Sequence, residues 1–114
     1  MKKNEMAFKE YLLKEKNYSV HTVNAYEKDL NDFAQFLNVN FEQEDLLEVN
    51  YSQIRSWIVF LIDENLSAIS VNRKISSLKA FYKFLLKSKQ IDYSPLLKHK
   101  SLKTGKKVQI PFSE

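Results

Sequence analysis

The residues best suited to chemistry lie on one polar helix face in the second half of the chain. Residues 70–90 contain Lys and Arg but no Asp or Glu. Lys and Arg can bind phosphates or guanine edges, Asn can pair with adenine, and small residues let a helix approach a groove. Solvated faces usually mix both signs of charge, so this face indicates nucleic-acid binding, with an ordinary solvated surface as the alternative. The helical wheel places Asn72, Arg73, Ser76, Lys79, Ala80, Lys83 and Lys87 there, and we add Ser70, Lys74 and Ser77 as candidate DNA contacts.

A second candidate face begins near residue 19 and is mostly neutral and hydrogen-bonding. Hydroxyl groups and free backbone N–H groups at a helix start can bind a phosphate. Ordinary helix capping explains Ser19 equally well, and both roles can hold at once. The candidate contacts on this face are Ser19, His21, Thr22, Asn24 and Lys28.

The distribution of charge also favours a polyanionic partner. Residues 67–114 contain eleven Lys or Arg against two acids, whereas residues 41–66 contain six acids against one Arg. A one-sided basic surface is typical of phosphate-binding proteins, because lysines release the counterions condensed on a polyanion. The net charge of +4 therefore conceals a strong separation of charge along the chain.

Catalytic, metal and cofactor chemistry find little support in the sequence. There is no cysteine, and the two histidines, His21 and His99, are far apart in sequence. A single glycine, Gly105, cannot form a glycine-rich phosphate loop. The acids at 42–48 have no basic or metal-binding companion. We therefore expect neither a catalytic site nor a bound metal or cofactor.

The elements that must position these faces are four predicted helices. Apolar residues recur at helical spacing in each segment, and the absence of Gly and Pro before residue 95 argues against a β fold. Ser19, Ser70 and an Asn50–Gln53 capping box are the predicted helix starts. The acidic connection near 38–48 should be a loop with one helical turn. The predicted helices cover about 4–16, 19–37, 50–64 and 70–89.

Residues 1–96 should form a single all-α domain, and residues 97–114 a basic tether. The length and the 44% apolar content suit one core. Pro95 cannot continue a helix, and the segment after it is rich in lysine. Apolar runs are short, and the basic start lacks the apolar region of a signal peptide. We expect a soluble, cytoplasmic protein with no membrane partner.

Several of these residues resemble a known family. The pattern at 19–37 resembles S-x-x-T-x-x-x-Y-x-x-D-L-x-x-F-x-x-F-L, which is found in the N-terminal core-binding domain of tyrosine recombinases of the XerC/XerD and phage-integrase type. Residues 54–58 and 70–85 look like the third and fourth helices of that domain, and Ile91 with Ser94-Pro95 resembles its exit. The resemblance spans about residues 8–111, and the order and spacing of the segments make it specific. The matching residues of the first pattern are Ser19, Thr22, Tyr26, Asp29, Leu30, Phe33, Phe36 and Leu37.

The resemblance implies a four-helix, SAM-like bundle that forms half of a clamp around a recombination half-site. In that family the second and fourth helices face the duplex. The tether leads to a catalytic domain, and other recombinase subunits assemble on the DNA. Because the chain ends at Glu114, about where that domain should begin, we expect no DNA cleavage by this polypeptide alone.

Other functions remain as alternatives to a DNA-binding arm. The main one is a helical protein-interaction module whose basic fourth helix docks an acidic partner. An enzyme would need a cluster of titratable groups that the sequence does not show. A helix-turn-helix regulator would normally carry a short turn with glycine between two compact helices, and that feature is absent.

Overall fold

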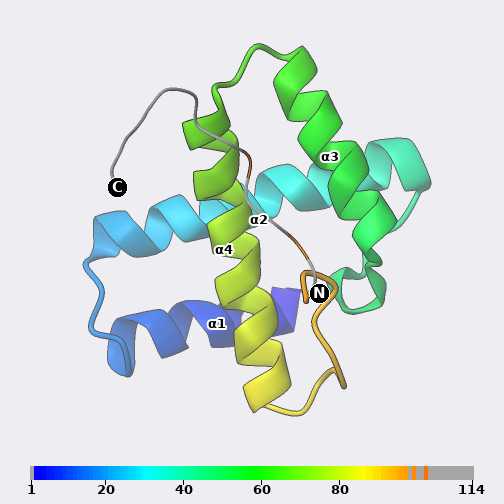
Figure 1. Cartoon of the computed structure of the whole chain (residues 1–114). Helices are drawn as coiled ribbons and strands as arrows, with labels where there is room; N and C mark the ends of the chain where they lie inside the picture. Colours follow the sequence, from blue (N-terminus) through cyan, green and yellow to red (C-terminus); the bar gives the residue numbers. More distant parts are fainter. Residues whose placement is uncertain (1, 98, 100–101, 103–114) are drawn as a thin grey trace, which may run out of the picture.

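The structure, a computed structural model, describes residues 2–97, 99 and 102. The described residues form four α-helices and one short 3-10 helix, with no strand among them. In Figure 1, α4 crosses in front of α1 and α2, and α3 lies to one side. The prediction of an all-α, four-helix fold is confirmed. The elements are α1 (Lys2–Lys14), α2 (Val20–Phe41), η1 (Leu46–Glu48), α3 (Tyr51–Asp63) and α4 (Ala68–Lys87).

Helix α2 begins where the sequence predicted and ends later. The Ser19 side chain caps it by accepting a hydrogen bond from the backbone N–H of Thr22 at 3.2 Å. The helix continues past Leu37 to Phe41, whose ring packs edge-on against Phe36. Glu42 then takes the left-handed conformation with φ of 52° and ends it. The prediction that the polar connection begins at residue 38 was therefore wrong by one helical turn.

Helix α3 has the predicted capping box at its start. The Asn50 side chain accepts from the backbone N–H of Gln53 at 3.0 Å, and the Gln53 side chain accepts from the backbone N–H of Asn50 at 3.1 Å. These bonds satisfy donors that a helix start otherwise leaves unpaired. The predicted inner stripe is also confirmed, since Ile54, Trp57, Ile58 and Leu61 are all buried.

Helix α4 begins earlier than predicted, which corrects the assignment of Ser70 as its cap. Ser67 is the N-cap, and its hydroxyl accepts from the backbone N–H of Ser70 at 3.2 Å. Ile69 is 67% exposed, so the buried apolar stripe of the helix starts only at Val71, three residues after its first residue. The predicted core face is confirmed, with Val71, Ile75, Leu78, Tyr82 and Leu85 fully or almost fully buried.

Aromatic side chains connect the helices through a single core. Phe8 of α1 is buried with its ring centroid 5.3 Å from that of Phe81 in α4. On the other side, the rings of Phe33 in α2 and Trp57 in α3 lie 5.0 Å apart. Each aromatic ring buries a large apolar area, so these pairs fix how α1 and α3 pack against α2 and α4.

The chain returns to the bundle after α4. Leu96 is buried, although Leu97 beside it is exposed. Nδ1 of His99 lies 3.0 Å from the hydroxyl of Tyr51 at the start of α3. The Asn72 side chain forms two hydrogen bonds with the backbone of Leu102, at 3.0 and 2.9 Å. The rest of the predicted tether, residues 98, 100–101 and 103–114, lies outside the described residues.

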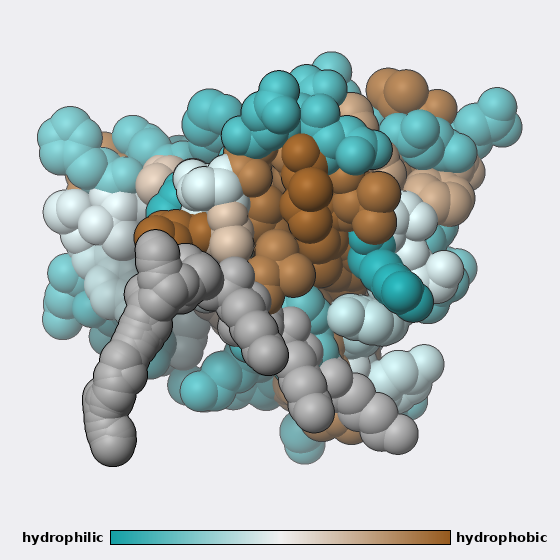
Figure 2. Space-filling view, turned by 45° about the horizontal axis from the view of Figure 1, so that its top comes forward, coloured by the Kyte–Doolittle hydropathy of each residue, from teal (hydrophilic) through white to brown (hydrophobic). Residues whose placement is uncertain are grey.

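One face of the bundle carries apolar surface around a hollow. Figure 2 shows hydrophobic residues gathered at the centre of that view, with hydrophilic residues around them. A cavity of about 510 Å³ lies between α2, α3 and the start of α4, and its apolar lining includes Phe36, Val39, Phe60 and Leu66. Across the described part of the chain, no helix is long and apolar enough to cross a bilayer.

Candidate nucleic-acid interface

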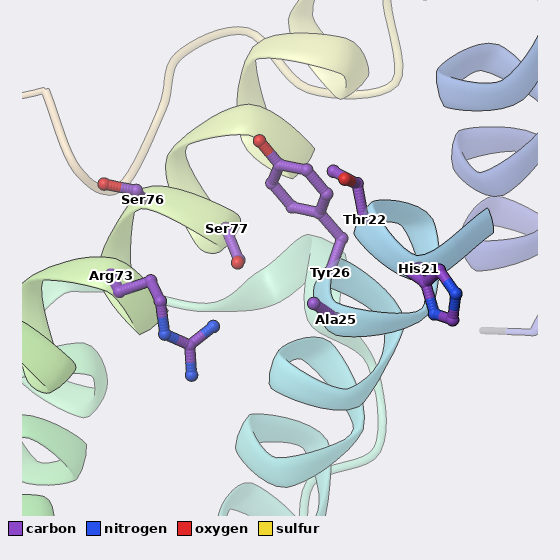
Figure 3. Close-up of a pocket in the computed structure, with 7 residues that line it drawn as sticks. All are labelled: His21, Thr22, Ala25, Tyr26, Arg73, Ser76 and Ser77. Carbon is purple, nitrogen blue, oxygen red and sulfur yellow. The ribbon is translucent and has the colours of Figure 1, made fainter. Parts of the chain in front are cut away.

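The start of α2 and the first half of α4 enclose an open groove of about 400 Å³. It joins residues from the two faces that the sequence singled out, although they are far apart along the chain. Figure 3 shows Arg73 and Ser77 reaching from α4 toward α2, with the ring of Tyr26 between Ser77 and Thr22. The groove is lined by His21, Thr22, Ala25, Tyr26, Arg73, Ser76 and Ser77.

The α2 side of the groove is a helix start. Val20 opens the helix, and the Ser19 hydroxyl both accepts from the Thr22 backbone and donates to the Thr22 hydroxyl at 3.1 Å. His21, Thr22 and Asn24 are exposed. Unpaired N–H groups and the positive end of the helix dipole favour an anion at such a position. Because its hydroxyl accepts from the Thr22 backbone N–H, Ser19 is the N-cap of α2, which is one of the two roles that the sequence allowed.

Two of the predicted contacts on α4 are buried in the interface with α2. The ammonium group of Lys74 lies 3.1 Å from the carboxylates of both Asp29 and Asp32, and the Lys74 residue is 8% exposed. Ser77 is 4% exposed, and its hydroxyl donates to Asp29 at 2.7 Å. Neither side chain can reach a duplex without leaving these partners.

The other predicted residues of α4 face outward to different degrees. Arg73, Ser76, Lys79 and Lys83 are exposed, whereas Ser70 is half-buried. Asn72 is half-buried, and its amide is paired with the backbone of Leu102. Of the exposed four, only Arg73 and Ser76 line the groove, since Lys79 and Lys83 follow on later turns of α4. The outward cations thus extend along α4 from the groove.

The remaining predicted contact, Lys28, lies outside the groove. Its ammonium group is 3.1 Å from Asp32, one helical turn away. Burial alone would raise the pKa of Asp32, but hydrogen bonds from Lys74 and Lys28 outweigh burial and lower it. Asp32 is therefore a carboxylate near neutral pH, and Lys28 is an exposed cation paired within its own helix.

Sequence reasoning missed two features of this region. Tyr26 lies three residues after Val23 and four before Leu30, a spacing that predicts a core residue, yet it is half-buried, lines the groove and stacks on Tyr18 with ring centroids 5.9 Å apart. Asp29 was given no role, although it is 1% exposed and accepts hydrogen bonds from three α4 side chains. The signal for Asp29 was an acid beside Leu30 on the inward face of α2, where a charge needs partners.

Comparison with known proteins identifies the family of the chain. Residues 6–89 match the family model described as "Phage integrase, N-terminal SAM-like domain". No solved structure gave a significant match.

Similar full-length proteins are tyrosine recombinases. XerC of Pediococcus pentosaceus is 39% identical over 88 residues, which cover 77% of this chain and 29% of the relative. XerC of Listeria innocua is 43% identical over 93 residues, or 80% of this chain and 30% of the relative. XerD of Rickettsia prowazekii is 38% identical over 90 residues, or 79% and 28% respectively.

The chain thus spans less than a third of the length of these curated relatives. The match lies in their N-terminal, non-catalytic part and does not cover a catalytic domain. The family model covers most of the chain and the described residues are all-helical, and the chain belongs to the N-terminal SAM-like domain family of phage integrases and tyrosine recombinases.

Proposed function

We propose that this chain is the DNA-binding arm of a site-specific tyrosine recombinase or integrase, and that it clamps one face of a recombination half-site. The observation that carries the proposal is the groove that Arg73 of α4 lines together with residues from the positively polarised start of α2. Exposed Lys79 and Lys83 continue the cationic surface along α4. Phosphate contacts of this kind supply most of the affinity for a duplex and set the register of the protein on it.

The side chains divide into distinct roles under this proposal. Arg73, Lys79 and Lys83 would contact phosphates, with the Thr22 hydroxyl at the start of α2. Ser76 is small and exposed, so it lets α4 approach base edges closely. Asn72 reads bases only if the duplex replaces its two hydrogen bonds to Leu102. Lys74 and Ser77 are left out because both are buried against Asp29.

The full-length protein would supply what this domain lacks. Strand cleavage and exchange would belong to a catalytic domain of the same polypeptide, and other recombinase subunits would join it on the DNA in the cytoplasm. A tethered second domain raises the effective concentration of the first, so this arm alone should bind more weakly than the pair.

A titration into a labelled duplex of about 30 base pairs tests the proposal, because a site of this length accommodates several turns of B-DNA. The Arg73→Glu/Lys79→Glu double variant should lose binding, since it replaces phosphate attraction by repulsion. The matched control is Lys14→Glu/Arg55→Glu, which changes the net charge equally at exposed positions on α1 and α3. It should keep most of the affinity.

Shift mapping by NMR then locates the contact surface. Changes concentrated on residues 19–28 and 72–87 support the DNA-binding arm. Wild-type protein that ignores the duplex even at low salt would contradict it and favour the protein-interaction module. Equal losses in the two charge-reversed variants would show that net charge, not this surface, determines binding.

A further inference from the structure

A buried carboxylate holds the arginine of the proposed DNA groove. Asp29 is 1% exposed, and both of its oxygens bond to α4. Oδ2 accepts from Nη1 of Arg73 at 3.1 Å and from the Ser77 hydroxyl at 2.7 Å, and Oδ1 accepts from Nζ of Lys74 at 3.1 Å. Two residues that line the groove, Arg73 and Ser77, are thus bonded to a carboxylate buried in the α2–α4 interface.

The two cations bonded to Asp29 differ in their exposure to solvent. The Lys74 side chain is 10% exposed and lies between Asp29 and Asp32, so it supplies a buried positive charge beside Asp29. The Arg73 side chain is 57% exposed and lines the groove. A guanidinium carries five N–H donors in a rigid fork, and its bond to Asp29 uses Nη1. Arg73 therefore has donors to offer a phosphate while it stays bonded to Asp29.

We propose that Asp29 is a positioning residue for DNA binding: it fixes the Arg73 guanidinium over the groove between α2 and α4. This inference rests on the proposed function. A long side chain that is already ordered loses less conformational freedom on binding, so its phosphate contact contributes more to affinity. The loss on binding is smaller because Asp29 has restricted Arg73 in the free protein.

The positioning role of Asp29 and the net charge of the protein predict opposite effects on DNA affinity when the Asp29 carboxylate is removed. Removing a carboxylate makes the protein more positive, and general electrostatics then predicts tighter binding to DNA. If Asp29 positions Arg73, Asp29→Asn should instead weaken binding. The matched control is Asp32→Asn, since Asp32 also bonds to Lys74 but has no bond to Arg73 among the described contacts.

The experiment compares duplex affinity of the wild type, Asp29→Asn, Asp32→Asn and Arg73→Ala, each first checked for folding by circular dichroism. Relative to Asp32→Asn, Asp29→Asn should bind roughly three- to tenfold more weakly, the cost of ordering one long side chain. In the Arg73→Ala background, Asp29→Asn should cause no further loss, because its effect passes through Arg73. A merely structural role would instead give additive losses.

Two outcomes would overturn the positioning role while leaving the DNA-binding arm intact. One is a folded Asp29→Asn that binds as tightly as Asp32→Asn or more tightly, and the other is an additive double variant. Absence of wild-type binding would overturn the proposed function itself. If Asp29→Asn does not fold, Arg73→Lys takes its place: it keeps the charge but loses the fork, and wild-type affinity in Arg73→Lys would also refute the proposal.

Discussion

A single hydroxyl joins the middle of α4 to the connection between α2 and α3. Tyr82 is 0% exposed, and its hydroxyl donates to the backbone carbonyl of Leu46 at 2.9 Å. Burial, and to a lesser extent the charge of Asp45, raise the pKa of Tyr82, so the phenol stays protonated and acts as a donor. This bond connects η1 to the core.

Removing that hydroxyl should therefore destabilise the fold. Tyr82→Phe leaves the Leu46 carbonyl buried without its donor, which should lower the free energy of unfolding by about 1–2 kcal/mol. Chemical denaturation followed by circular dichroism measures the change. Tyr93→Phe is the control, because Tyr93 is 71% exposed and should show almost no loss. Equal stability of the two variants would contradict a structural role for the Tyr82 bond.

His99 makes the contact of the returning chain with α3 sensitive to pH. Burial and the nearby charge of Lys79 hold the pKa of His99 below its ordinary value of 6.5. The docked chain thus binds a proton less readily than the released chain. Its stability is complete above pH 6.5 and falls as the pH drops through 6.5 toward the lowered value. An NMR titration of the His99 ring, with a peptide of residues 96–102 as reference, should give the lower pKa in the protein. Identical values would rule out this docking in solution.

At the residue scale, the sequence predicted which side chains of α4 are buried or exposed better than it predicted which residues they contact. The apolar stripe of α4 and the exposure of Arg73, Ser76 and Lys79 could be predicted from helical spacing. Burial of Lys74 and Ser77 could not, because it depends on where α2 crosses α4 and on Asp29 lying at that crossing. A helical wheel describes the faces of one helix, whereas the position of the crossing depends on how two helices pack against each other.

At the scale of whole elements, two serines near the start of α4 differ in their roles: Ser67 is the N-cap, whereas Ser70 lies inside the helix. Ser67→Ala should cost about 1 kcal/mol of unfolding free energy, because it removes the acceptor for the Ser70 backbone N–H. Ser70→Ala should cost less, since Ser70 lies within the helix and contributes only its side-chain bond to Ser67 at 3.2 Å. Thermal or chemical unfolding of both variants decides the order. A larger loss in Ser70→Ala would support the cap expected from the sequence.

The element boundaries show why sequence signals fail at helix ends. Asn65–Ile69 looks like a turn by composition, yet Ala68 and Ile69 are already helical and Asn65, with φ of 69°, makes the turn. Phe41 still belongs to α2, where its ring packs against that of Phe36, and Glu42, with φ of 52°, ends the helix. In both places a single left-handed residue that composition does not reveal lies at the boundary, whereas the capping box of α3 has a local sequence pattern and could be predicted.

Over the whole molecule, the fold places the acidic and basic segments of the chain on different parts of the surface. Acidic residues 42–48 lie in the connection beyond α2, whereas the exposed cations of α4 extend from the groove. Acidic and basic segments could be predicted from the sequence, but only the fold places Arg73 in one groove with the start of α2. A duplex that approaches the groove would meet the basic face of the bundle.

The salt dependence of the DNA affinity should report how many phosphates the basic face of α4 contacts. With Arg73, Lys79 and Lys83 each on a phosphate, the logarithm of the affinity should fall with the logarithm of salt concentration with a slope of about −3. Lys83→Ala should make the slope less negative by about one, because one fewer counterion is released. Lys14→Ala removes the same charge from α1 and should leave the slope unchanged. Fluorescence anisotropy over a series of salt concentrations measures all three slopes. If Lys83→Ala and wild type share a slope, this turn of α4 does not touch the DNA backbone, and the contact is confined to the groove beside Arg73.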